Sequence, residues 1–141
     1  DVTATILDVA CVSAEETRSW SLDGDSLLPL MRGETDDWKD FAFAEHMAHG
    51  TDRPRAMVRE GDWKLCYSHG EPPEFELYDL HADPGEFTNL AGDPDHRAVR
   101  ERLLARILEE WGDPERLTRE IVSSQEARLL IRNVMGDDAL F

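Results

Sequence analysis

The chain has 141 residues, enough for one domain and too few for two domains of ordinary size. Its 15 basic and 31 acidic residues give a formal net charge of −16, which repels the phosphates of nucleic acids and anionic lipids. No apolar run approaches the roughly 20 residues that a bilayer-spanning helix needs. We therefore expect no nucleic-acid partner and no membrane partner.

The N-terminal quarter of the chain shows two short helical patterns. Apolar residues at three- and four-residue spacing predict an amphipathic helix with one buried face over residues 2–11. A turn rich in Asp and Gly follows, after which Asp25 or Ser26 can cap a second helix that ends at Gly33. Because the sequence starts inside the first helix, at Asp1 and without Met, we expect the chain to be a piece of a longer protein.

The middle of the chain predicts an antiparallel sheet of about four strands. Alternation puts Phe41, Phe43, Glu45 and Met47 on one face of the first strand. The pair Gly61-Asp62 predicts a two-residue type II′ turn between the second and third strands. The expected strands cover residues 41–47, 54–60, 63–69 and 74–80.

Apolar residues recur at helical spacing in the last third of the chain. Asp93-Pro94 predicts the start of a helix that ends before Gly112, and Asp113-Pro114 starts another that ends at Gly136. A helix pair packed on a small sheet is an α+β fold. We treat the chain as one unit, residues 1–141, with the sheet and short helices in 1–92 and a helical tail in 93–141.

Glu45, His46 and His49 are all residue types that bind borderline metals. In a strand, however, His46 and His49 face opposite sides, so we predict no metal site and prefer Glu45 alone as a residue that points into a cleft. Asp79, Asp83 and Glu86 could suggest calcium, but their spacing differs from that of an EF-hand loop. Pro84-Gly85 between them favours a tight turn.

The sequence offers no convincing nucleophile. Ser68-His69 and Ser123-Ser124 lack the flanking glycines of a nucleophile elbow, and Cys66 lies in the middle of a strand. A disulfide between Cys11 and Cys66 and two buried free thiols both fit the sequence, and we favour the thiols. We expect no catalytic residue in this chain.

Four segments, in order, resemble the C-terminal region of type I sulfatases. Residues 77–91 carry Leu-Tyr-Asp-Leu, then Asp-Pro-Gly-Glu, then Asn-Leu, and residues 23–30 carry Asp-Gly-Asp-Ser-Leu-Leu-Pro-Leu. Residues 57–64 are similar to the Arg-x-Gly-x-x-Lys hairpin of that family. Residues 1–10 are similar to its Asp-x-x-Pro-Thr-Leu-Leu-Asp helix, with Ala4 where Pro is usual.

Further features resemble choline-sulfatase-like enzymes in particular: Glu45, Arg55-Ala-Met-Val-Arg, Pro72-Pro73 and a tail with Ser124-Gln125 and Arg128. In those relatives an acidic residue at the position of Glu45 faces the substrate, and the tail makes oligomer contacts. The resemblance thus implies a substrate-binding role for Glu45, a homo-oligomer and a cytoplasmic location.

The resemblance also implies that the intact protein is an alkaline-phosphatase-like enzyme with a divalent metal, calcium or manganese, and a formylglycine nucleophile. Formylglycine is made from Cys or Ser in Cys/Ser-x-Pro-x-Arg, and this chain lacks that motif: Val-Ser-Ala-Glu follows Cys11, and Tyr-Ser-His-Gly follows Cys66. We therefore expect the chain to be inactive alone and to form one wall of the substrate cleft beside an N-terminal catalytic domain.

Two other interpretations remain open at this point. Phosphonate and phosphodiester hydrolases of the same superfamily share much of this C-terminal region. An independent acidic binding or assembly module with the same fold is the interpretation from a different functional class.

Overall fold

The computed structural model describes residues 1–13, 20, 22–34, 38–47 and 50–135. The chain forms two compact units, residues 1–39 and 40–141. The sequence predicts one unit, residues 1–141, with an internal division after residue 92. In the structure the sheet and the long helices that follow it belong to the same unit.

The first unit joins two short helices, α1 (Val2–Val9) and α3 (Leu28–Met31). The Thr5 hydroxyl accepts a hydrogen bond from the Leu27 amide at 2.9 Å, and the Ser26 hydroxyl donates to the Asp8 carboxylate at 2.6 Å. A side chain at Gly24 would overlap the backbone of Asp1, which explains a glycine there. The two N-terminal sulfatase-like segments of the sequence therefore hold each other in place.

The predicted buried face of the first helix is wrong. Val2, Ile6 and Val9 are 62–67% exposed, and α1 has no buried residue. The first unit is too small to enclose both sides of a two-turn helix. The second helix has the predicted Pro29 in its first turn and Gly33 after its end at a φ of +82°, but its N-cap is Leu27 rather than the predicted Asp25 or Ser26.

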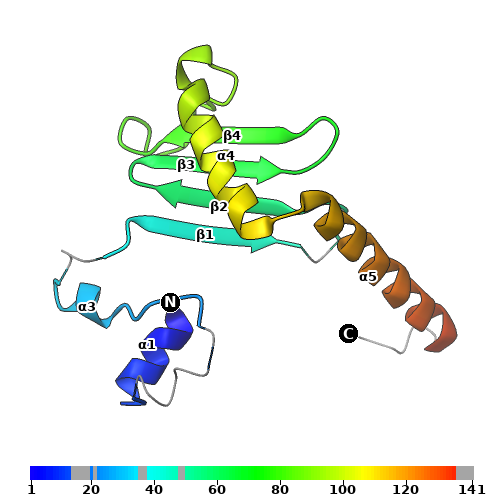
Figure 1. Ribbon diagram of the computed structural model, residues 1–141, viewed down its shortest axis with the longest axis horizontal. Helices are drawn as coiled ribbons and strands as arrows, with labels where there is room; N and C mark the ends of the chain where they lie inside the picture. The colour runs from blue at the N-terminus through cyan, green and yellow to red at the C-terminus, as the bar shows by residue number, and fades with distance from the viewer. Residues whose placement is uncertain (14–19, 21, 35–37, 48–49, 136–141) are drawn as a thin grey trace. The chain divides into compact units, whose positions relative to one another are not determined.

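The second unit is built on a four-stranded antiparallel sheet in the order β1-β2-β3-β4 (Figure 1). Its strands are β1 (Phe41–His46), β2 (Arg55–Glu60), β3 (Trp63–Ser68) and β4 (Glu74–Asp79). Each lies within one residue of its predicted bounds. Gly61 has a φ of +60° and Asp62 does not have a positive φ, the pattern of a type II′ turn.

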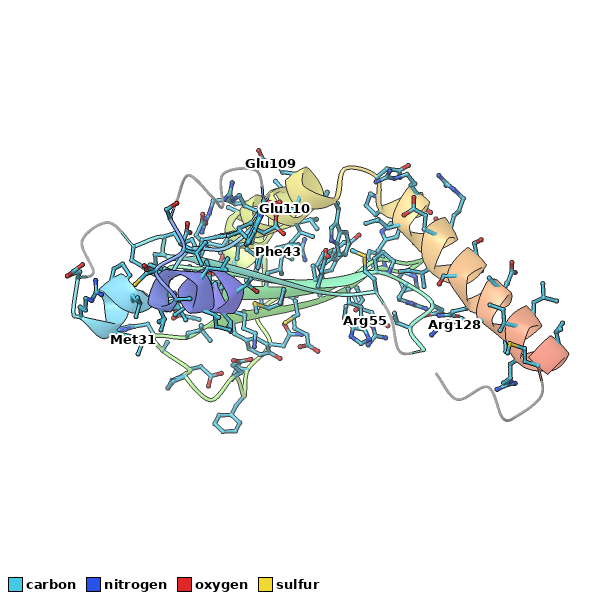
Figure 2. All side chains as sticks on the ribbon, turned by 90° about the horizontal axis from the view of Figure 1, so that it is seen from below. Met31, Phe43, Arg55, Glu109, Glu110 and Arg128 are labelled. Carbon is cyan, nitrogen blue, oxygen red and sulfur yellow. The ribbon has the colours of Figure 1, made fainter. Side chains whose placement is uncertain are left out.

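Helix α4 (Arg97–Trp111) lies across one face of this sheet (Figure 1). Val58, Leu65 and Leu77 share one row of the sheet and are fully buried, as are Leu103 and Ile107 on the helix. Figure 2 shows the sheet from its edge, with Phe43 on the side of α4 and Arg55 on the other side. The predicted α+β fold and the predicted buried face of this helix are confirmed.

Both ends of α4 follow from single residues. The Asp93 carboxylate accepts a hydrogen bond from the Asp95 amide at 2.9 Å and begins η1 (Pro94–His96), the short 3₁₀ turn before α4. Gly112, with a φ of +69°, ends the helix directly after Trp111.

Helix α5 (Pro114–Met135) packs on the rest of its unit only near its start. Leu117 packs against the core and Ile121 is 6% exposed. The predicted apolar face does not continue, because the remaining large apolar residues are 39–77% exposed: Val122, Leu129, Leu130, Ile131, Val134 and Met135. In Figure 1 the helix runs away from the sheet, so only α4 covers the sheet as predicted. Gly136 lies outside the described residues.

Candidate functional site

Glu45 lies at one end of the sheet, in a row that continues through Ala56 and Tyr67 to Phe75. The rings of Tyr67 and Phe75 are stacked with centroids 5.1 Å apart, and Trp111 is tilted against Tyr67 at 5.8 Å. Because this row faces α4, the Glu45 carboxylate lies on the same side of the sheet as these three aromatic rings. We call Glu45, Tyr67, Phe75 and Trp111 the end cluster.

Trp111 is the direct partner of Glu45 in the end cluster. Its indole N–H donates a hydrogen bond to Glu45 Oε2 at 3.3 Å. Trp111 is only 5% exposed, whereas the Glu45 side chain is exposed. Among the described residues Glu45 makes no ion pair. The arrangement is an exposed carboxylate fixed at one oxygen by a buried donor.

A second polar link joins the end cluster to α5. The Tyr67 hydroxyl and His69 Nδ1 lie 2.8 Å apart, and His69 Nε2 lies 2.8 Å from Glu115 Oε1. Burial, together with the nearby Glu115 carboxylate, raises the pKa of Tyr67. From the sequence, His69 stood out only beside Ser68, and Glu115 did not stand out at all. No local pattern signals this pair, because its members are 46 positions apart.

Glu45 and His46 are adjacent in strand β1, so their side chains face opposite sides of the sheet. His49 lies outside the described residues. Across the described ranges, no group of three or more Cys, His, Asp or Glu side chains is arranged to hold a metal ion.

The face of the sheet opposite α4 is hollowed over a volume of about 340 Å³. Met57, Cys66 and Glu76 share one row of this face, and the hollow is lined by their strands. Burial raises the pKa of the Cys66 thiol, so it is a poor nucleophile at neutral pH. Both cysteines are free thiols, as expected. Cys11 is exposed, whereas the sequence predicted that it would be buried.

The carboxylates considered for calcium are used in the turn after β4. Asp79 Oδ1 accepts hydrogen bonds from the amides of His81 and Ala82 at 3.0 Å. Asp83 Oδ2 accepts from the Thr88 amide at 2.8 Å. This pattern is that of a tight turn, as the sequence predicted.

Two of the sulfatase-like segments meet at one ion pair. Lys64 Nζ lies 2.6 Å from Glu86 Oε2, which joins the hairpin of β2 and β3 to the turn after β4. The hydrogen bond that Lys64 donates to the Glu86 carboxylate raises the pKa of Lys64. Lys64 and Glu86 therefore have a structural role, because their ion pair joins these two segments.

A match with a known family decides the identity of this fold. The family model described as "N-sulphoglucosamine sulphohydrolase, C-terminal" matches residues 1–112. The chain belongs to this sulfatase C-terminal domain family. Both units contribute to the match, and the resemblance seen in the four sequence segments is confirmed.

Two relatives illustrate the range of sulfatases that share this domain. A choline-sulfatase of Rhizobium meliloti (strain 1021) is 42% identical over 94 residues, which are 67% of this chain and 17% of the relative. An N-acetylglucosamine-6-O-sulfatase of Bacteroides thetaiotaomicron is 30% identical over 116 residues, covering 78% of this chain and 20% of that protein. The chain thus spans about a fifth of the length of these two relatives.

Solved structures show the same fold. A putative sulfatase from Bacteroides thetaiotaomicron superposes with a TM-score of 0.65 at 30% identity, over 82% of this chain and 25% of the other. The phosphonate monoester hydrolase of Agrobacterium radiobacter gives a TM-score of 0.56 at 29% identity, over 77% of this chain and 23% of the other. The domain therefore occurs in hydrolases of more than one ester class.

The sulfatase family implies a divalent metal and a formylglycine in an intact enzyme. The residues present here do not fit either group. The sequence contains no Cys/Ser-x-Pro-x-Arg motif, and the described part of the chain offers no cluster of metal ligands. We assign no step of sulfate-ester hydrolysis to a metal or a nucleophile in this domain.

Proposed function

We propose that this chain is the C-terminal region of a sulfatase that hydrolyses a cationic sulfate ester such as choline sulfate. The match of the sulfatase family model over residues 1–112 carries the sulfatase part of the proposal. The 42% identity to a choline-sulfatase supports the cationic ester. In this proposal the domain forms one wall of the substrate cleft and does not supply the nucleophile.

Glu45 is the residue proposed to recognise the cation. Its carboxylate is exposed, and no ion pair within the described residues neutralises it. A quaternary ammonium has no N–H to donate, so it is recognised through charge and through aromatic faces. The end cluster supplies the charge through the exposed Glu45 carboxylate, whereas its Tyr67 and Trp111 rings are 7% and 5% exposed and support that carboxylate from the core.

We further propose that the domain works against two partners. An N-terminal catalytic domain, carrying the metal and the nucleophile, is the first. A second copy of the protein is the other, with the exposed apolar half of α5 as the contact surface. A helix that is apolar on several sides is typically buried in an assembly.

The Glu45→Gln variant of the full-length protein tests the substrate assignment. We would compare kcat/KM for choline sulfate with that for 3,3-dimethylbutyl sulfate, the isostere in which an uncharged tert-butyl group replaces the trimethylammonium. Loss of one charge contact is expected to lower the ratio of the two values about tenfold, roughly 1.4 kcal/mol. Glu110→Gln, an exposed charge change on α4, is the matched control and should leave the ratio unchanged.

The outcomes separate the parts of the proposal. An unchanged ratio in Glu45→Gln would refute the cationic substrate while leaving the sulfatase assignment in place. A full-length protein that hydrolyses sulfate esters, together with an inactive 1–141 chain, would support the assignment of the chemistry to another domain. Turnover by the 1–141 chain alone would contradict it.

Phosphonate or phosphodiester hydrolysis is the second candidate. The superposition on a phosphonate monoester hydrolase favours it, at nearly the same identity as the sulfatase structure. Parallel assays with an aryl sulfate and a phenyl phosphonate ester distinguish the two, because a preference for the phosphonate would replace the sulfatase proposal.

A further inference from the structure

The Trp111 side chain is held in place by the core in which it is buried. Trp111 is the last residue of α4 and belongs to the core, and Gly112 turns the chain away directly after it. An indole N–H is a donor only, and a buried one needs an acceptor. That acceptor is Glu45 Oε2, 66 positions earlier in the chain.

The hydrogen bond restrains a side chain that would otherwise move freely. An exposed Glu has three rotatable side-chain bonds, and fixing them on ligand binding costs conformational entropy. A donor held in a rigid core removes part of that cost before the ligand arrives. A carboxylate can accept about four hydrogen bonds, so one bond from Trp111 leaves the rest of the group available.

We propose that Trp111 is a positioning residue, whose indole N–H holds the Glu45 carboxylate in the orientation that receives the cationic group of the substrate. This inference rests on the proposed function of Glu45. The new element is that recognition of the cationic group depends on Trp111, a core residue at the end of α4. The packing of α4 on the sheet places this residue beside Glu45.

The Trp111→Phe variant of the full-length protein tests this role. Phe keeps an aromatic ring in the core and removes the donor. We expect the kcat/KM ratio of choline sulfate to 3,3-dimethylbutyl sulfate to fall about fivefold, mainly through KM for the cationic ester. Trp63→Phe, an equivalent substitution at a partly buried Trp that packs beside His96, is the matched control and leaves the ratio unchanged.

The double variant Glu45→Gln/Trp111→Phe distinguishes positioning from general damage to the fold. If Trp111 acts through Glu45, the double variant has the same ratio as Glu45→Gln alone. A Trp111→Phe ratio equal to wild type, with a lowered ratio in Glu45→Gln, would overturn the positioning role and leave the proposed function intact. Unchanged ratios in both single variants would overturn both.

A spectroscopic measurement tests the contact without activity. In full-length protein with ¹⁵N-labelled tryptophan, the Trp111 indole signal is assigned by its loss in Trp111→Phe. We expect Glu45→Gln to shift this signal, because a neutral amide oxygen replaces a charged acceptor. It should leave the Trp63 signal in place. A Trp111 signal that does not respond to Glu45→Gln would overturn the inference, whatever the activity of Trp111→Phe.

Discussion

Asn89 closes the free edge of the sheet with its side chain. Its Oδ1 accepts hydrogen bonds from the amides of Leu77 at 3.0 Å and Ala91 at 2.9 Å, and its Nδ2 donates to the Phe75 carbonyl at 3.1 Å. The Leu90 amide adds a bond to the Leu77 carbonyl at 2.8 Å. An edge strand leaves backbone groups unpaired unless something covers them. The Asn-Leu of the sulfatase-like segment therefore protects β4.

Replacement of this residue should destabilise the domain. Asn89→Ala leaves the Leu77 amide and the Phe75 carbonyl without these partners, so we expect the free energy of unfolding to fall by about 1–3 kcal/mol. Urea denaturation followed by tryptophan fluorescence measures it. Asn89→Asp keeps the acceptor and loses the donor, and should lie between Ala and wild type. Equal midpoints for all three proteins would show that this edge does not depend on Asn89.

The start of α4 is an element whose stability depends on pH. The Asp95 amide, with a smaller effect from His96, lowers the pKa of Asp93 below its ordinary value of 3.8. A lowered pKa in the folded state means that the contribution is present above about pH 4 and is lost as pH falls through the folded pKa. The Asp93 cap thus stabilises η1, the turn that leads into α4, more at neutral pH than in acid.

The Asp93→Asn variant isolates this dependence, because Asn caps a helix about as well as Asp but does not titrate. Between about pH 5 and pH 2 the wild type should lose more of its stability than the variant. Urea midpoints at several pH values, each compared with the value at pH 7, measure the difference. Parallel curves for the two proteins would mean that the Asp93 carboxylate does not contribute in the folded state.

At the scale of the whole molecule, α5 is the part whose packing is incomplete. Its first turns are tied to the rest of the unit by Ile121, by the His69–Glu115 pair and by a hydrogen bond from Gln125 to the Thr51 carbonyl. Beyond Gln125 the large apolar side chains are exposed. Exposed apolar area of this kind is common at interaction surfaces, and the proposed contact between two copies would use it.

If this surface joins two copies of the protein, a single charge introduced into the contact by substitution should dissociate the assembly. We expect Leu130→Glu in the full-length protein to reduce the molar mass in solution to that of a monomer, because an unpaired carboxylate cannot be buried in the contact. Light scattering after size-exclusion chromatography measures the mass. Ser123→Glu adds the same charge at an exposed polar position on α5 and should not change it. An assembly that survives Leu130→Glu would exclude this part of α5 as the contact.

The secondary structure was largely predictable from the sequence because its signals are local. Alternation in the four strands, the Gly61-Asp62 turn and the apolar spacing of α4 each depend on residues close together in the chain. Membership of the sulfatase family could also be predicted from the sequence. The sulfatase-like segments form turns and ion pairs, such as that of Lys64 with Glu86, and these need particular residues at fixed positions. The role of Glu45 in substrate binding and the homo-oligomer stay predictions.

The tertiary structure alone decided which apolar faces are buried and which polar groups meet. Periodicity shows that α1 and α5 have apolar residues, but burial depends on what packs against them, and both helices remain largely exposed in the described chain. The contact of Glu45 with Trp111 arises because α4 crosses the sheet and ends beside β1, a geometry that no spacing along the chain encodes. Local patterns along the chain were thus sufficient to predict the elements, the family and Glu45, whereas the contact of Glu45 with Trp111 follows from the packing of α4 on the sheet.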